Sequence, residues 1–241
     1  MKPTLIIISG PNGAGKTTFA RNLITERLPN DFEFLNADLI ADALSPFKPQ
    51  SVAIAAGKEF LARFDQLLSQ QTSFVAETTL SSLTLQKRLK KARLAAYRIQ
   101  IIFISLPNSD LAVERVKQRV KLGGHDIPET TIRRRFVRSI KNFDGIYLSL
   151  SDTAVLLDGK MKQPGRIARW NSGVLTQVND TVCFAQYLDR TAELEEEATS
   201  YDTEENLAFI EMVDQTCLDV EKFLTELEAT SGIPLVEAKP D

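Results

Sequence analysis

The stretch that decides the fold reads TLIIISGPNGAGKTT and spans residues 4–18. Residues 4–9 form an almost unbroken aliphatic run, the pattern of a strand buried on both faces of a parallel sheet. Residues 10–17 match G-x-x-x-x-G-K-[ST] at every fixed position, and a helical pattern follows. This order predicts a P-loop, in which backbone N–H groups surround phosphate oxygens beside the positive end of a helix. The predicted nucleotide-binding residues are Gly10, Pro11, Asn12, Gly13, Ala14, Gly15, Lys16, Thr17 and Thr18.

Beyond the loop, β-rich runs alternate with helical runs as far as about residue 158. The alternation predicts an α/β P-loop NTPase with a nucleotide-kinase-like, doubly wound, mostly parallel five-stranded sheet and a C-terminal helical extension. Residues 160–180 show little periodicity and are predicted to form a loop. The predicted strands are 4–9, 32–36, 73–77, 98–106 and 153–157, and the predicted helices are 16–28, 52–68, 84–97, 110–120, 129–142, 182–197 and 203–230.

The composition is that of a globular protein, with 43% hydrophobic and 25% charged residues in 241 positions. The apolar run near the N-terminus is too short for a signal peptide or a membrane span. The two cysteines form no CxxC pair, and a single histidine leaves no Cys/His zinc site. We therefore expect a cytoplasmic protein with no membrane partner.

Charge divides the chain at about residue 180. Residues 1–180 carry 16 acidic and 26 basic residues, a net of +10, whereas residues 181–241 carry 16 and 3, a net of −13. We predict a P-loop kinase domain over 1–180 and an acidic helical extension over 181–241. The extension can complete the fold or restrain the domain in cis, and one of its predicted helices carries an apolar stripe that can dock or pair with a partner. That stripe consists of Ile210, Val213, Cys217, Val220, Leu224 and Leu227.

Two acidic residues lie where predicted strands end, which is where open α/β sheets bind ligands. Asp38 follows the second strand and can accept the proton of an attacking hydroxyl, although aspartate can also cap the next helix. Glu77 ends the third strand. If that strand lies beside the first, Glu77 takes the place of a Walker-B acid and holds Mg²⁺ with Thr17. The predicted substrate-side residues are Asp38, Glu77, Thr78 and Thr79, and the predicted metal ligands are Thr17 and Glu77.

Arginines gather in two predicted helices on either side of Gly123 and Gly124. Helices joined by a glycine-containing turn suit a lid that closes over ATP, and guanidinium forks match phosphate oxygens. The arginines of 133–138 cannot all point at one ligand, so we expect at least one to face solvent. The predicted catalytic residues are Lys16, Asp38, Arg119, Arg134 and Arg135.

Four segments resemble the zeta toxin family of P-loop kinases. They are GPNGAGKTT (10–18), FLNADLIA (34–41), VAETTLSS (75–82) and GGHDIPETTIRRRF (123–136). The resemblance implies a kinase that phosphorylates a sugar hydroxyl of UDP-N-acetylglucosamine and is held in check by an antitoxin protein. The residue roles that it implies are phosphate binding by Lys16, proton acceptance by Asp38, substrate contact by Glu77 and Thr78, and stabilisation of the transferred group by Arg119 with Arg134 or Arg135.

These observations predict an ATP-dependent kinase that uses ATP and Mg²⁺ to phosphorylate a hydroxyl of a small acceptor. A metabolite, nucleotide or antibiotic kinase on the same fold is an alternative. The basic excess of residues 1–180 also leaves open a nucleic-acid-associated ATPase, but the basic residues lack the interleaved aromatic side chains of single-strand binders. We therefore expect no nucleic-acid partner. A regulatory switch that only binds ATP is a third class, and it would not need a base such as Asp38.

Overall fold

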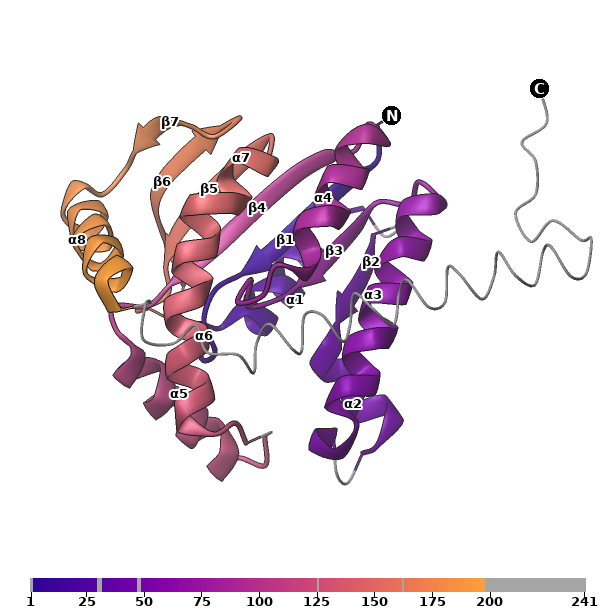
Figure 1. Cartoon of the computed structure of the whole chain (residues 1–241), viewed down its shortest axis with the longest axis horizontal. Helices are drawn as coiled ribbons and strands as arrows, with labels where there is room; N and C mark the ends of the chain where they lie inside the picture. The colour runs from indigo at the N-terminus through magenta and orange to yellow at the C-terminus, as the bar shows by residue number, and fades with distance from the viewer. Residues whose placement is uncertain (1, 30–31, 47–48, 125, 162, 198–241) are drawn as a thin grey trace, which may run out of the picture. The chain divides into compact units, whose positions relative to one another are not determined.

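The computed structural model describes residues 2–29, 32–46, 49–124, 126–161 and 163–197, which belong to one compact unit (Figure 1). These residues form a seven-stranded sheet in the order β2-β3-β1-β4-β5-β6-β7. The strands are β1 (Thr4–Ser9), β2 (Glu33–Asn36), β3 (Phe74–Glu77), β4 (Arg98–Ser105), β5 (Thr153–Asp158), β6 (Gly165–Asn171) and β7 (Val174–Val178). The helices are α1 (Lys16–Arg27), α2 (Ala37–Leu44), α3 (Ala53–Ser69), α4 (Thr84–Leu94), α5 (Ser109–Lys121), α6 (Glu129–Asn142), α7 (Leu148–Leu150) and α8 (Thr181–Glu197), with a 3₁₀ turn η1 (Pro49–Val52) and a π-helical turn η2 (Phe143–Tyr147).

Strands β1 to β5 are parallel, and β1 lies between β3 and β4. Ile8 therefore pairs in register with Glu77 on one side and with Ile102 on the other. This confirms the α/β class, the mostly parallel sheet and the nucleotide-kinase-like strand order. The carboxyl ends of β1, β2 and β3 meet at one edge, so the residues that follow them are brought together.

Helices cover both faces of the sheet, with α1 behind it and α3, α4 and α6 in front (Figure 1). The core on the front side contains two runs of aromatic rings. Under α3 and α4, Phe64 meets Phe74 edge-on at a centroid distance of 5.0 Å. Under α6, Phe103 stacks on Phe143 at 4.5 Å, and Phe143 meets Trp170 edge-on at 6.0 Å. No helix in the described segments is long and apolar enough to cross a membrane.

The prediction that residues 160–180 form a loop was wrong, because this segment contains β6 and β7. The two strands form an antiparallel hairpin, and β6 also pairs antiparallel with β5. Ser172 and Gly173 make the two-residue turn, with φ angles of 49° and 77°. Positive φ at both positions is the backbone of a type I′ hairpin turn. The hairpin raises the predicted five strands to seven in the described part of the chain, and shifts in register within it hide the alternating pattern.

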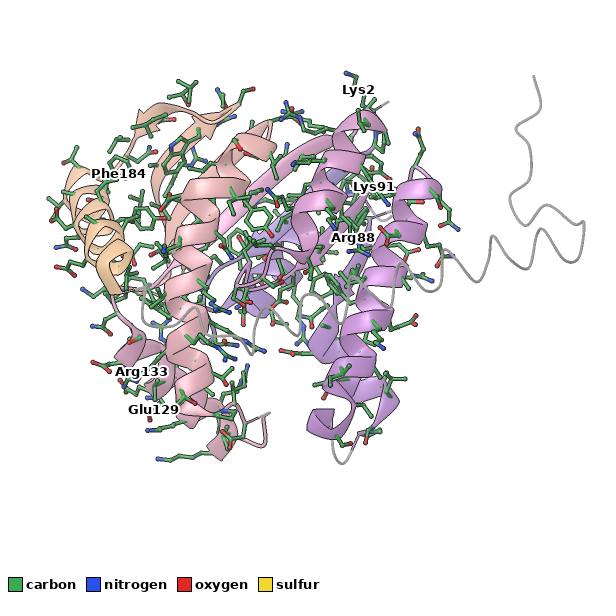
Figure 2. All side chains as sticks on the ribbon, in the orientation of Figure 1. Lys2, Arg88, Lys91, Glu129, Arg133 and Phe184 are labelled. Atoms are coloured by element: carbon green, nitrogen blue, oxygen red, sulfur yellow. The ribbon has the colours of Figure 1, made fainter. Side chains whose placement is uncertain are left out.

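Helix α8, the first helix of the predicted extension, packs against the sheet domain. Tyr187 is buried, and its hydroxyl donates to Asp144 Oδ2 over 2.8 Å. Phe184, labelled in Figure 2, meets Trp170 edge-on at 6.0 Å. The division of the chain at residue 180 stays a prediction about its organisation. The predicted helix 203–230 and its apolar stripe lie outside the described residues.

Candidate active site

The P-loop lies between β1 and α1, as the sequence predicts. Gly10 packs against the carbonyl oxygen of Ile104 on β4. Its φ of 135° is a backbone conformation that residues with a side chain rarely adopt. A side chain at position 10 would collide with that backbone, which explains the glycine. Lys16 is buried, and its Nζ donates to Pro11 O over 2.8 Å, so the ammonium points back into the loop.

Glu77 joins the P-loop to the neighbouring strand ends. Its Oε1 accepts a hydrogen bond from Thr17 Oγ1 over 2.8 Å, and its Oε2 accepts one from Asn36 Nδ2 over 2.6 Å. Its side chain is only 8% exposed. A hydroxyl and a carboxylate are the oxygen ligands that Mg²⁺ prefers, so these residues fit the cation. Thr17 and Glu77 are therefore brought together where the sequence expected a metal site.

Asp38 is exposed in the first turn of α2. The cap of that helix is Asn36, whose Oδ1 accepts hydrogen bonds from the backbone N–H groups of Asp38 at 2.7 Å and Leu39 at 3.1 Å. Capping therefore does not account for the carboxylate of Asp38. Its charge acts on both Lys16 and Arg135, which places it at the same corner of the molecule as the P-loop.

Electrostatic effects on Lys16 identify the groups that surround it. Burial lowers the pKa of Lys16 to about 8, while the carboxylates of Glu77 and Asp38 act to raise it. The cations Arg119 and Arg135 lower it further. Residues from α1, α2, β3, α5 and α6 thus converge on one site, although they are far apart in the sequence.

The three consecutive arginines of α6 face different surroundings. Burial lowers the pKa of Arg135, Asp38 acts to raise it, and Arg134 lowers it further. Within the described ranges, the side chains of Arg134 and Arg135 form no hydrogen bond or ion pair. Arg134 acts on Arg135 and is not among the groups that shift Lys16. Among the described residues, Arg119 and Arg135 are therefore the arginines whose charges act on Lys16.

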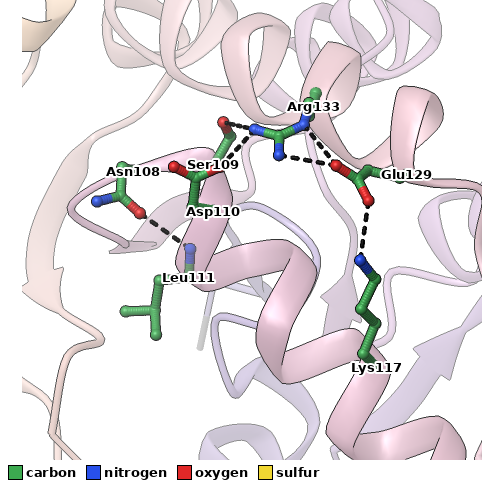
Figure 3. Close-up of polar contacts among 7 residues, drawn as sticks. All are labelled: Asn108, Ser109, Asp110, Leu111, Lys117, Glu129 and Arg133. Atoms are coloured by element: carbon green, nitrogen blue, oxygen red, sulfur yellow. Dashed lines mark hydrogen bonds and ion pairs between the residues drawn. The ribbon is translucent and has the colours of Figure 1, made fainter.

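Arg133 instead belongs to a polar network on the outer side of α5 and α6 (Figure 3). Its guanidinium forms ion pairs with Glu129 at 2.8 Å and Asp110 at 2.7 Å, and it donates a hydrogen bond to the Ser109 hydroxyl over 2.9 Å. Glu129 in turn binds Lys117 of α5 at 2.9 Å. Figure 2 shows Glu129 and Arg133 at the opposite end of the molecule from Lys2. This network holds the two helices together. The guanidinium of Arg133 is therefore occupied by side chains of its own chain.

Thr78 and Thr79 lie directly after β3, at the rim of the same edge. The backbone N–H of Thr78 donates to Ile8 O over 3.0 Å, which continues the pairing between β3 and β1. The hydroxyls of Thr79 and Ser81 are 2.8 Å apart. Leu80, between them, is buried with a φ of 55°, and its carbonyl accepts from Asn142 Nδ2 over 2.7 Å. The loop that follows β3 is therefore held to the end of α6.

Sequence reasoning missed two residues that build this site. Asn36 both caps α2 and binds Glu77, and an asparagine directly before a helix is a recognisable cap signal. Arg115 of α5 donates to the carbonyl oxygens of Gly159 at 2.7 Å and Lys160 at 2.8 Å, and to Gly13 at 3.4 Å. No local pattern could reveal Arg115, because its partners are distant in the sequence.

Residues 5–139 match a protein family described as an AAA domain, and this match covers more than half of the chain. The chain belongs to this AAA-domain family. A relative within reach of sequence comparison is an uncharacterized protein of Haemophilus influenzae, which is 29% identical over 136 residues. That alignment covers 56% of this chain and 94% of the relative.

Solved structures with the same fold include components of two-protein systems. A chain of the AvrRxo1-ORF1:AvrRxo1-ORF2 complex has a TM-score of 0.60 and 19% identity, over 77% of this chain and 63% of that chain. The AAA-domain protein thus spans less than two thirds of that relative. A chain from the PezAT chromosomal toxin-antitoxin system of Streptococcus pneumoniae has a TM-score of 0.54 and 14% identity, over 81% of this chain and 87% of that chain. At these identities the likeness concerns the fold.

Proposed function

We propose that this protein is an ATP-dependent phosphotransferase that moves the γ-phosphoryl group of ATP to a hydroxyl of a small acceptor. The observation that carries the proposal is the convergence of a buried P-loop lysine, a Thr17–Glu77 oxygen pair, an exposed Asp38 and two arginines on one corner. A protein that only binds ATP has no need of a carboxylate or of partly buried arginines in that position.

Each residue has a role that follows from its chemistry. Lys16 and the backbone N–H groups of residues 10–17 bind the phosphates, and Thr17 with Glu77 would hold Mg²⁺. Bound Mg²⁺ supplies positive charge that neutralises the β- and γ-phosphate oxygens. Asp38 accepts the proton of the acceptor hydroxyl, and Thr78 and Thr79 line the acceptor side. Arg119 and Arg135 stabilise the negative charge of the transferring group, with Arg134 as a second candidate from α6.

The acceptor that we propose is a sugar nucleotide such as UDP-N-acetylglucosamine, in the manner of zeta toxins. An antitoxin protein is the proposed partner, and the fold shared with a chain of a toxin-antitoxin system supports it. A structure of the AvrRxo1-ORF1:AvrRxo1-ORF2 complex with ATP, at a TM-score of 0.57, supports ATP as the nucleotide.

The proposal is tested by incubating the full chain with ATP, Mg²⁺ and a panel of sugar nucleotides, sugars, nucleosides and aminoglycosides, followed by mass spectrometry. We expect one phosphoryl group to be added to a sugar nucleotide by the unmodified protein, and about 10²-fold more slowly by Asp38→Asn. Phosphorylation of a nucleoside or an antibiotic instead would overturn the sugar-nucleotide assignment while retaining the kinase. ATP hydrolysis that no acceptor accelerates would argue against both.

A further inference from the structure

Two arginines outside the proposed catalytic set grip the backbone around the P-loop. Arg115, in the middle of α5, donates to the carbonyl oxygen of Gly13 within the loop at 3.4 Å. The same guanidinium donates to Gly159 O at 2.7 Å and to Lys160 O at 2.8 Å, in the turn that follows β5. One planar fork thus ties α5, the P-loop and that turn together.

The direction of the Gly13 peptide explains why this tie matters for phosphate binding. In a peptide group the C=O and the following N–H point in opposite directions. A carbonyl of Gly13 turned toward Arg115 therefore turns the N–H of Ala14 toward the inside of the loop. That N–H donates to Pro11 O over 3.3 Å, and the same carbonyl oxygen accepts from Lys16 Nζ on the inner side of the loop. Arg115 consequently orients a donor that the P-loop needs on its inner side.

The turn after β5 is wedged between the P-loop and the end of β4. The N–H of Gly159 donates to Ser105 O over 2.8 Å. A methyl group added at Gly159 would lie 2.8 Å from Ser105 O and 3.2 Å from Ala14 O. The first contact is shorter than side chains tolerate and the second is tight, so a side chain at position 159 would force this turn or its neighbours to shift. Movement of this turn or of the β4 end is therefore transmitted directly to the loop.

Arg190 binds the end of β4, which the turn after β5 also contacts. It reaches from α8 to the end of β4, where it donates to Leu106 O at 2.6 Å and to Ser105 Oγ at 3.0 Å. Its guanidinium also lies 5.9 Å from the centre of the buried Tyr187 ring. The carbonyl of Ile104, one residue earlier on β4, is the atom against which Gly10 packs. Helix α8 thus fixes the strand end on which the P-loop rests.

We propose that Arg115 and Arg190 are positioning residues for the P-loop, the first by direct contact and the second through the carboxyl end of β4. The proposal rests on the proposed nucleotide-binding role of residues 10–18. Neither arginine needs to touch the nucleotide, because each acts by fixing backbone carbonyls whose peptide groups or neighbours form the phosphate cradle. It also assigns α8 a part in the site, although α8 lies beyond the residues that match the AAA-domain family.

Hydrogen exchange of the full chain without nucleotide tests the proposal directly, since it reports on the loop itself. Methionine variants keep an unbranched apolar side chain and remove the donors. We expect Arg115→Met to speed exchange in residues 10–18 by about tenfold and Arg190→Met by about threefold, because charge-assisted hydrogen bonds to these carbonyls are lost. Arg133→Met is the matched control, since Arg133 makes as many bonds on the outer side of α5 and α6 and is expected to leave exchange in the loop unchanged.

Binding of ATP gives a second readout that a general loss of stability would not move. We expect the Kd for ATP to rise about tenfold in Arg115→Met and to recover in part in Arg115→Lys, whose ammonium can still donate to one or two carbonyls. The two arginines bind the turn after β5 and the end of β4, which contact each other. The effect of Arg190→Met is therefore expected to shrink when Arg115 is already replaced.

The two proposals fail in different ways. Unchanged exchange in residues 10–18 of Arg115→Met, or an equal change in Arg133→Met, overturns the positioning role. If Arg115→Met does not fold, Arg115→Lys decides the matter by the same exchange measurement. Failure of the unmodified protein to bind ATP contradicts the proposed function alone, because the exchange measurement requires no nucleotide.

Discussion

Arg133 and Arg135 lie two positions apart on the same helix, and their surroundings are opposite. Arg133 forms ion pairs with Glu129 and Asp110 on the outer side of α5 and α6. Arg135 is partly buried near Asp38, and its side chain forms no hydrogen bond or ion pair among the described residues. Residues two apart in an α-helix project about 200° from each other, so this separation follows from helical geometry.

Identical side chains on one helix can therefore be sorted by the charges that already neutralise them. The outer arginine has its charge balanced by carboxylates of the protein, so it joins helices. The inner arginine is desolvated, and among the described residues Asp38 is the acid whose charge acts on it, so it is suited to receive an anion from outside the protein. Substitutions on the inner side are expected to affect chemistry, and substitutions on the outer side to affect helix packing.

The largest effect is expected at Lys16, the cation that the inner acids and arginines surround. Lys16→Ala removes the only ammonium that reaches into the P-loop among the described residues. We expect phosphoryl transfer to fall by about 10³-fold while circular dichroism and the melting temperature stay near those of the unmodified protein. Full activity of this variant would contradict the P-loop assignment.

A second large effect is expected at Asp38, the acid whose charge acts on Arg135. Asp38→Asn keeps the size of the side chain but cannot accept a proton, and α2 keeps its cap because Asn36 supplies it. Turnover should fall by about 10²-fold with the Kd for ATP unchanged, as measured by steady-state kinetics and titration calorimetry. Unchanged turnover would show that the base lies elsewhere.

The contrast between Arg133 and Arg135 is tested by replacing each of them with lysine. Arg135→Lys keeps the charge but loses the planar fork, and we expect kcat to fall about 30-fold with KM values changed less than about threefold. Arg133→Lys is the matched variant and should leave both parameters unchanged. A loss confined to KM in Arg135→Lys would mean that Arg135 binds the ground state rather than the transferring group.

A smaller effect is expected at Glu77, which orients the Thr17 hydroxyl through its hydrogen bond. Glu77→Gln removes the negative charge beside that hydroxyl. We expect the Mg²⁺ concentration for half-maximal activity to rise about tenfold, with activity recovered at high Mg²⁺. A Mg²⁺ dependence identical to that of the unmodified protein would remove Glu77 from the metal site.

Much of this fold was predictable because its main signals are local. The buried strand, the P-loop pattern and the helical periodicity of residues 129–142 each lie within one short segment. The hairpin of β6 and β7 escaped because register shifts break its alternation and most residues of β7 are exposed, so neither strand shows a clear apolar period. The serine–glycine pair at its turn was the available signal.

The candidate site divides in the same way. Lys16, Thr17, Asp38 and Glu77 were found because motifs and strand ends mark them. Which arginine of 133–135 faces inward was not decided by sequence, since it depends on how α6 is rotated against α5 and the sheet. Arg115 and Arg190 bind backbone carbonyl oxygens. Every residue has such an oxygen, so the amino-acid sequence does not mark these partners.

We propose that the site around Lys16, Asp38 and Arg135 moves a phosphoryl group from ATP to a small molecule. It is tested most directly by incubating the full chain with γ-labelled ATP, Mg²⁺ and a small-molecule extract of bacterial cells, and then separating the labelled products. We expect the label to enter an organic phosphate with the unmodified protein and with Arg133→Lys, and about 10³-fold more slowly with Lys16→Ala. Label that appears only in inorganic phosphate, at a rate that the extract does not change, would contradict it.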